Sequence, residues 1–399
     1  MNIPYTTPAR PSLIKILGAM GFRPFYLLAA IWSVLAMALW LAILSGMIEI
    51  ELFWNPFWWH GHEMLFGFVG AAAAGFMLTA APIWSASPAL SGRPLLMIVL
   101  AWLVGRIAVL FSPFLPVLFI ALADLSFWVL FLKASAPTLW NTGNRVHRIF
   151  PSLLALVFIG NILMHLESLG WSQQTAHRGL YLGIDAIIFF LVVVGGHIMP
   201  MFTRETLNTG EQNLQFPLIP AFEIAGVVTM VAVLIGDLVD YQHPLTGYLY
   251  LSAAIVQTLR FSRWHVLKTF GNPMLWSLHV GFSWLILGLF LAGISRLTDW
   301  LDIVVALHAL TVGAMGFFIL GIMSRISLIH TGQSVVAGRR LTAAFFVLLL
   351  SACLRLFPDL PLPIGAVFVS ALLWMVSFSL FLWVFWGRLT KPRVDGEPG

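Results

Sequence analysis

The sequence predicts an all-α, multi-pass membrane protein with about twelve transmembrane helices and both termini in the cytoplasm. Of its 399 residues, 60% are hydrophobic and only 9% are charged, whereas soluble domains are about 45–50% apolar and about 25% charged. Apolar stretches long enough to cross a bilayer follow one another along the chain. Lysine and arginine gather in alternate connections between these stretches, as the positive-inside rule requires.

Twelve apolar segments of about 18–25 residues are separated by polar breaks. They lie near 24–46, 62–84, 94–112, 114–133, 148–169, 178–203, 217–236, 245–262, 274–295, 302–327, 341–357 and 363–387. Between the third and fourth, residues 111–114 fit either a tight turn or a kink. We expect residues 1–390 to form one integral membrane domain and residues 391–399 to form a short cytoplasmic tail.

The orientation follows from the basic residues. Seventeen of the 21 lysines and arginines fall on the side that holds the N-terminus, and only Arg106, Arg178, Arg296 and Arg355 fall on the other. This bias predicts that the first side is cytoplasmic and that an even number of spans returns the C-terminus to it. The first segment is predicted to be a retained anchor rather than a signal peptide. Topology explains the net charge of +5, so nothing indicates nucleic acid.

Several site classes are excluded by the residues the chain lacks. Cys353 is its single cysteine, which rules out an internal disulfide, CxxC metal sites and the CxxCH attachment of a covalent haem. A Walker motif and a G-x-G-x-x-G fingerprint are also missing from the sequence. Any metal must therefore be held by histidine, methionine, a carboxylate or a porphyrin.

The most informative stretch is WWHGHEMLFG at 58–67, where His60, His62 and Glu63 stand at the start of a long apolar segment. Such groups beside a membrane are costly unless they are paired, hydrated or bound to something. Two interpretations stay open: an interfacial hydrogen-bonded cluster, and a metal or haem site. If both histidines are helical they point to opposite faces, and we expect His62 to face inward with Glu63 as the carboxylate that orients it.

Histidines fall into two layers by predicted depth. The outer layer holds His60, His62, His165 and His308, and the inner group holds His197, His279 and His330. The others, His147, His177, His243 and His265, fall in connections, where we expect solvated side chains. A lone membrane histidine is more often structural than a ligand, but four in one layer favour ligands of haem b or copper. The layers are about 20 Å apart, so we expect any catalytic pair within one layer, preferably the outer.

Charged residues in the spans suggest further roles. Five acids, Glu63, Asp124, Glu167, Asp185 and Glu223, could pass protons or simply cap and pack helices. Arg23 and Arg106 are candidates to bind haem propionates, although both could instead extend to the lipid headgroups.

A set of motifs together resembles one known family. They are Gly21-Phe22-Arg23-Pro24-Phe25, WHGHEMLFGF at 59–68, Asn161 to His165, Leu275 to His279, LHALTVGAMG at 307–316, and Arg325 with His330-Thr331-Gly332. Over nearly the whole chain the sequence is similar to the NnrS family of bacterial inner-membrane proteins. The resemblance implies haem, copper and a role in resistance to nitric oxide during denitrification or nitrosative stress.

Together with the two predicted layers of histidines, the resemblance implies roles for particular residues. Catalytic roles fall to Glu63 and His165. Haem b or its propionates would be bound by His60, His62, His279, His308 and Arg23, and metal by His62, His165, His197, His279, His308 and His330. The expected reaction is reduction of two NO to N2O, with electrons from quinol or a separate donor.

The chain departs from the family pattern at two places. Gly195-Gly196-His197 stands where Gly-Gly-Arg is expected, and Gln333 follows His330-Thr331-Gly332 where Arg is expected. Both departures weaken the roles implied for His197 and His330. Two alternatives remain: a secondary transporter, against which we find no repeat between the two halves, and a non-enzymatic NO- or metal-binding protein that protects against nitrosative stress.

Overall fold

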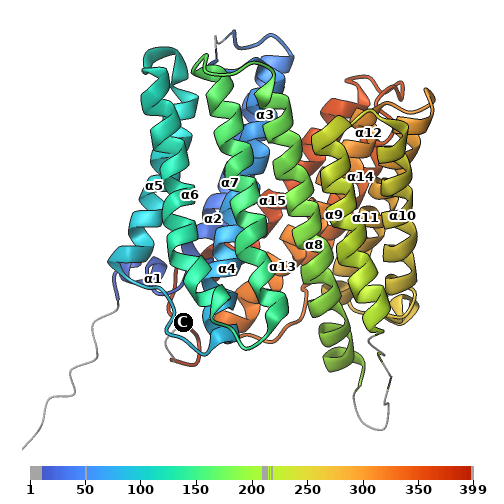
Figure 1. Ribbon diagram of the computed structural model, residues 1–399. Coiled ribbons are helices and arrows are strands. Elements are labelled where there is room, and N and C mark those ends of the chain that lie inside the picture. Colours follow the sequence, from blue (N-terminus) through green and yellow to red (C-terminus); the bar gives the residue numbers. More distant parts are fainter. Residues whose placement is uncertain (1–10, 50–51, 209–213, 215, 217–218, 397–399) are drawn as a thin grey trace, which may run out of the picture.

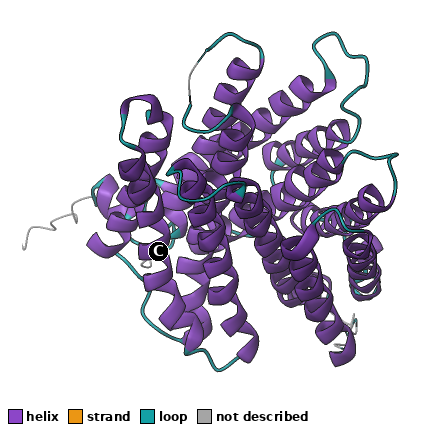
Figure 2. Ribbon diagram, turned by 45° about the horizontal axis from the view of Figure 1, so that its top comes forward, coloured by secondary structure: helices purple, strands orange, loops and turns teal. Residues whose placement is uncertain are grey.

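The structure is a computed structural model that describes residues 11–396, apart from 50–51, 209–213, 215 and 217–218. The described residues form helices and connecting turns with no strand, so the predicted all-α class is confirmed (Figures 1 and 2). Of the predicted tail, residues 397–399 lie outside this description, as does the start of the predicted segment 217–236.

Helices occupy all twelve predicted segments. In order they are α2 (Phe22–Leu44), α3–η1–α4 (Pro56–His62, Glu63–Val69, Gly70–Ser85), α5 (Arg93–Leu110), α6 (Val117–Trp140), α7 (Ile149–Ser168), α8 (Thr175–Leu207), α9 (Pro220–Asp240), α10 (Pro244–Phe261), α11 (Pro273–Leu297), α12–η5–α13 (Ile303–His308, Ala309–Met315, Gly316–His330), α14 (Arg339–Arg355) and α15 (Ala366–Leu389). Short helical turns complete the described chain: α1 (Leu13–Leu17), η2 (Ser112–Phe114), η3 (Arg145–Arg148) and η4 (Val266–Lys268).

Ten of the helical segments found in the described residues are long and apolar enough to cross a membrane. The two predicted spans outside this set are α14, which has 17 residues, and α10, in which Gln257 and Arg260 are buried. A multi-pass membrane protein is therefore supported, while the count of twelve spans and the cytoplasmic termini stay predictions. Between α5 and α6, residues 112–114 form a short 3₁₀ turn, so the tight turn was the better of the two interpretations.

Local sequence sets where the helices that carry the site begin. The Asn55 side chain accepts hydrogen bonds from the backbone N–H groups of Phe57 and Trp58, and Pro56 occupies the first helical position of α3. The Asp302 side chain caps α12 in the same way through Val304. Both arrangements satisfy backbone donors that a helix start leaves without partners. They fix the starts of α3 and α12, and His62 and His308 are the last residues of these two short helices.

The second, sixth and tenth helical segments form the centre of the bundle (Figure 1). In Pro56–Ser85 and Thr175–Leu207, 94% of the most apolar window is buried, and in Ile303–His330 the share is 67%, whereas α9 on the outside reaches only 17%. α15 packs against α2, which closes the bundle. Polar groups on the three central segments are therefore enclosed by protein rather than by lipid.

Close approach of α7 and α8 depends on glycine. A Cβ on Gly160 of α7 would collide with the backbone carbonyl of Gly179, and a Cβ on Gly179 would collide with that of Gly160. Backbones can approach this closely only where both residues lack a side chain. The contact fixes α7 against α8 one turn before His165.

Two of the central segments contain a π-helical stretch, η1 directly after His62 and η5 directly after His308. A π-helical turn holds an additional residue, and such insertions occur frequently at functional sites. One additional residue turns a helix by about 100°. Each π-helical stretch therefore changes the direction of the side chains before it relative to those after it. The directions in which the His62 and His308 side chains point are changed in this way.

Candidate metal centre

A buried cluster of two histidines and an aspartate lies in the N-terminal half of the bundle. His62 comes from the end of α3, Asp124 from the middle of α6 and His165 from the end of α7. Their candidate ligand atoms lie within 4.8 Å of one another, and the side chains are 0%, 1% and 1% exposed. Within the part of the chain that the structure describes, this is the one such group of three or more His, Cys, Asp or Glu residues.

One carboxylate oxygen stands at the centre of the cluster. Asp124 Oδ2 lies 3.1 Å from His62 Nε2 and 2.9 Å from His165 Nε2, and it accepts a 2.8 Å hydrogen bond from the Asn161 amide. Asn161 Oδ1 also lies 3.0 Å from His62 Nε2. Three helices therefore converge on one point. Glycine makes the approach of α5 to α6 possible, since a Cβ on Gly105 would lie 3.0 Å from the Asp124 Cα.

A second layer surrounds these groups. Glu63 Oε1 lies 3.0 Å from His62 Nδ1 and accepts a 2.7 Å hydrogen bond from Arg106, whose guanidinium also pairs with Asp124. Trp32 Nε1 donates to the other oxygen of Glu63 at 2.7 Å. The predicted contact between Glu63 and His62 is thus present. Such a contact orients an imidazole that binds metal.

The contacts of the His62 ring show whether a cation would fit the cluster. Its two ring nitrogens face the carboxylates of Glu63 and Asp124, but a neutral imidazole has only one N–H. The other nitrogen would then direct a lone pair at a carboxylate oxygen. An imidazolium or a metal ion removes this conflict. The formal charges of Glu63, Asp124 and Arg106 also leave one negative charge, which a buried site must balance.

Two imidazoles and a carboxylate form a donor set that metals use in proteins. Non-haem iron is bound by two histidines and one carboxylate with open coordination positions, and imidazole also suits copper. The indole of Trp54 covers the cluster, with its ring centroid 4.3 Å from that of His62 and 5.1 Å from that of His165. The residues present therefore fit a redox-active metal ion in a site shielded from bulk water.

The four predicted outer-layer histidines form two pairs instead of one group. His62 and His165 share the cluster, with ring centroids 5.7 Å apart. His60 points to the other side, as the helical spacing predicted, and its ring stacks on Trp40 at 4.6 Å. His308 Nδ1 lies 2.7 Å from the Val304 carbonyl oxygen. His60 and His308 lie near each other, and Arg355 lies near both.

The inner histidines have different surroundings. His197 faces His147, with ring centroids 5.4 Å apart, and His330 lies 5.5 Å from the Phe22 ring. His279 Nδ1 lies 3.0 Å from the Leu275 carbonyl oxygen. No ligand group of three includes any of these inner histidines within the described chain.

The structure also gives the surroundings of His147 and Arg23. His147 was expected to be solvated, but it is buried and stacks on Trp84 at 4.4 Å, because the connection before α7 folds under the bundle. Arg23, a candidate for haem propionates, is buried and donates hydrogen bonds to the carbonyl oxygens of Leu389 and Lys391 at 3.1 and 2.9 Å. Its guanidinium ties the first helix of the membrane domain to the end of α15.

Sequence reasoning missed several members of the cluster as site residues. Arg106 and Asp124 were noted only as a possible propionate partner and a possible proton carrier, and Trp32 and Trp54 were not noted. Asp124 lies within a predicted span, where an ionisable group by itself predicts function, whereas Arg106 lies towards the predicted outer end of one. The two tryptophans carry no comparable indication, since 17 tryptophans are spread along the chain.

Comparison with known proteins adds one finding. The family model described as NnrS protein matches residues 16–393 of the chain. The match contains all residues of the buried cluster, both π-helical stretches and every helix from α2 to α15. A comparison with curated proteins gives no match.

Proposed function

The chain belongs to the NnrS family, and from this premise we propose that it is a metal-dependent membrane protein that binds nitric oxide and reduces it to N2O. The family links the protein to nitric oxide. The single observation that supports a reaction site is the buried cluster of His62, Asp124 and His165, which has two imidazoles and a carboxylate in reach of one ion. Ligand groups of this kind are rare inside a membrane unless they serve function.

The three residues would hold copper or iron, and the bound ion would supply an electron-rich, redox-active centre for NO. Glu63 fixes the orientation of the His62 ring. Arg106 neutralises part of the charge on the two carboxylates. Trp54 keeps bulk water away from the cluster. The chain thus supplies a fixed, dry and nearly charge-balanced setting, which is how proteins favour reactions that move charge.

Reduction of two NO molecules consumes two electrons and two protons and gives N2O and water. Protons must therefore reach the cluster. Glu63 touches His62 directly, and Glu167 lies two residues beyond His165 at the end of α7. We assign Glu63 to pass protons to the cluster and His165 to bind the metal ion beside Asp124, whose Oδ2 lies 2.9 Å from His165 Nε2.

A haem b would be held on the other side of α3, by His60 and His308. The Nδ1 atom of His308 is engaged by the Val304 carbonyl, which leaves Nε2 for a ligand, and Nδ1 of His60 is buried with no hydrogen-bond partner among the described residues. Arg355 adds a positive charge suited to a propionate. Haem bound there would store and transfer single electrons.

The test is the metal and haem content of purified variants, together with NO consumption. We expect His165→Ala to lose the non-haem metal and at least tenfold of the NO consumption while it keeps its haem. His308→Ala should lose haem, and His243→Ala, at the exposed start of α10, should lose neither. Full non-haem metal in folded His165→Ala would refute the assignment. Wild-type protein that binds NO but consumes none with any donor would favour the non-enzymatic alternative.

A further inference from the structure

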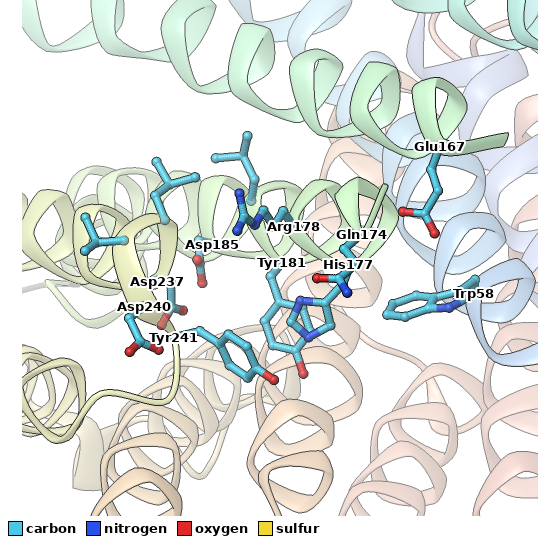
Figure 3. A pocket seen from close by; sticks show the side chains of 13 residues that line it. Trp58, Glu167, Gln174, His177, Arg178, Tyr181, Asp185, Asp237, Asp240 and Tyr241 are labelled. Atoms are coloured by element: carbon cyan, nitrogen blue, oxygen red, sulfur yellow. The ribbon is translucent and has the colours of Figure 1, made fainter. Parts of the chain in front are cut away.

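A cavity of about 400 Å³ adjoins the candidate metal centre at the outer ends of α3, α7, α8 and α9 (Figure 3). Trp58 and Glu167 line it. Trp58 lies four residues before His62 on α3, and Glu167 lies two residues after His165 on α7. The helices that carry two of the three proposed ligands therefore also form a wall of this cavity. None of its lining side chains is used in the function proposed above except Glu167.

Aromatic rings form the middle of the cavity. His177 and Tyr181 stack with centroids 4.4 Å apart, and Tyr241 lies 4.6 Å from His177. Trp58 meets the His177 ring edge-on at 5.7 Å. Neither the His177 imidazole nor the hydroxyl groups of Tyr181 and Tyr241 hydrogen-bond to any described residue. Three polar groups on an aromatic wall are thus available to a ligand.

Carboxyl groups lie on both sides of this wall. In Figure 3, Glu167 lies beside Trp58 on one side of His177, and Asp185, Asp237 and Asp240 lie on the other. Each of these carboxyl groups already accepts a hydrogen bond, which for Asp240 comes from the Gln242 N–H. Glu167 accepts a 2.7 Å hydrogen bond from the Ala176 N–H, and Asp237 pairs with Arg296 at 3.0 Å. The Tyr250 hydroxyl lies 2.6 Å from Asp237 and 3.2 Å from Asp185.

The lip of the cavity is apolar. Leu238 and Val239, near the end of α9, line it and are 45% and 80% exposed. α9 is the least buried of the candidate spans, so these side chains face the surroundings of the bundle, which for a membrane protein are lipid. A ligand with a polar ring and a hydrocarbon tail could therefore enter from the bilayer.

We propose that this cavity binds a membrane hydroquinone and that the hydroquinone supplies the electrons for the proposed reduction of NO. A hydroquinone is a flat ring with a hydroxyl at each end, which matches an aromatic wall flanked by acceptors on both sides. Its tail fits the apolar lip. An organic cation fits less well, because the carboxylates already have donors while the imidazole and phenol groups have none.

The electrons and protons of the proposed step balance. Both O–H bonds of the hydroquinone break, and the ring becomes a quinone as it releases two electrons and two protons. His177 takes up one proton, and a carboxylate at the far end takes up the other. Two NO molecules receive the two electrons and, with two protons, form N2O and water. This inference rests on the proposed function for the oxidant, but the binding site itself can be tested without turnover.

Binding is tested first, on the purified full-length protein. Decylubiquinone and menadione serve as probes, and quenching of tryptophan fluorescence is the readout. We expect His177→Leu and Tyr241→Ala each to weaken binding about tenfold, with metal and haem contents as in the wild type. Tyr248→Ala is the matched control, because this tyrosine of α10 is 61% exposed and does not line the cavity. Wild-type protein that binds neither quinone, or binds putrescine in their place, overturns the proposal.

Turnover then separates this inference from the proposed function. We expect the ratio of NO consumption driven by reduced decylubiquinone to that driven by ascorbate with a soluble mediator to fall about tenfold in His177→Leu. NO consumption with the mediator but no binding of quinone overturns the hydroquinone site and leaves the proposed reduction intact. Quinone binding that depends on His177, without NO consumption from any donor, supports the site and overturns the reduction.

Discussion

At the scale of single residues, Arg106 is the group on which the charge of the metal centre depends. Its guanidinium contacts both Glu63 and Asp124 from a position 2% exposed. Without it, two carboxylates would stand in an apolar interior with only imidazoles, the Trp32 indole and the Asn161 amide as partners. Removing one member of a buried charge network commonly costs about 3–5 kcal/mol, because the other charge is left unpaired.

We therefore expect Arg106→Leu to lower the stability of the metal-free protein by about 3–5 kcal/mol. A bound cation can replace the missing positive charge, so added metal should raise the unfolding temperature of this variant more than that of the wild type. Thermal unfolding in detergent, with and without metal, measures both effects. Arg93→Leu at the exposed start of the same helix is the control. Equal stability of the two variants would contradict this account.

The residues that could be predicted from the sequence are those whose partners are close in the chain. Glu63 follows His62 directly, and their contact was expected from adjacency alone. Asp124, Arg106 and Asn161 reach the same point from α6, α5 and α7, and their meeting depends on how three helices pack. The spacing of apolar residues predicts which face of a helix is buried, but it does not predict which other helix packs against that face. These contacts could therefore not be predicted from the sequence.

At the scale of elements, the two π-helical stretches lie in matching sequence. His62 is followed by Gly67 and Gly70, and His308 is followed at the same spacing by Gly313 and Gly316. In both cases the histidine immediately precedes the π-helical residues. The apolar periodicity of these segments predicted transmembrane helices. It could not show an inserted residue, because a segment that is apolar on nearly every face has the same pattern after a rotation of about 100°.

Close helix packing gives a prediction at this scale. Gly160→Ala should displace α7 from α8, because the new methyl group would meet backbone atoms of Gly179 that cannot move aside. We expect a loss of about 1–3 kcal/mol in stability, as for other overpacked sites, and reduced metal content because His165 lies five residues further on. The measurements are unfolding temperature and metal content.

Gly387→Ala is the control for this substitution. Gly387 also lies within a helix, α15, but a Cβ there meets no atom within 4 Å. It carries the same change in helix propensity without the collision. If both alanine variants keep the metal content and the unfolding temperature of the wild type, glycine packing does not position His165.

At the scale of the whole molecule, the basic residues that break the positive-inside pattern all lie at or beside clusters described above. Arg106 neutralises the metal centre, and Arg178 lines the cavity beside it. Arg296 pairs with Asp237 under the same cavity, and Arg355 lies near His60 and His308. Positive charge on the side predicted to be outer is therefore concentrated where it lies beside other polar or charged groups.

Because of this distribution, an experiment on membrane topology tests the predicted position of the candidate metal centre, the cavity and His308 together. Figure 1 shows the C-terminal end of the chain at one end of the bundle and α12 at the other. The metal centre, the cavity and His308 lie towards the α12 end, so they face outward if the termini are cytoplasmic. We expect reporter fusions at Gly396 and at Asp240 to give opposite sidedness. The fusion at Gly396 should be active as a cytoplasmic fluorescent protein, and the fusion at Asp240 as a phosphatase that requires export.

The physical reason is the uneven charge. Seventeen of the 21 lysines and arginines lie in the segments predicted to be inside, and basic connections are retained in the cytoplasm during insertion. Removing one basic residue should leave the orientation unchanged, so Arg339→Ala carrying each fusion serves as the control. Equal sidedness at Gly396 and Asp240 would require an even number of spans between them, instead of the predicted five. The predicted outward position of the candidate metal centre and the cavity, which depends on this topology, would then lose its support.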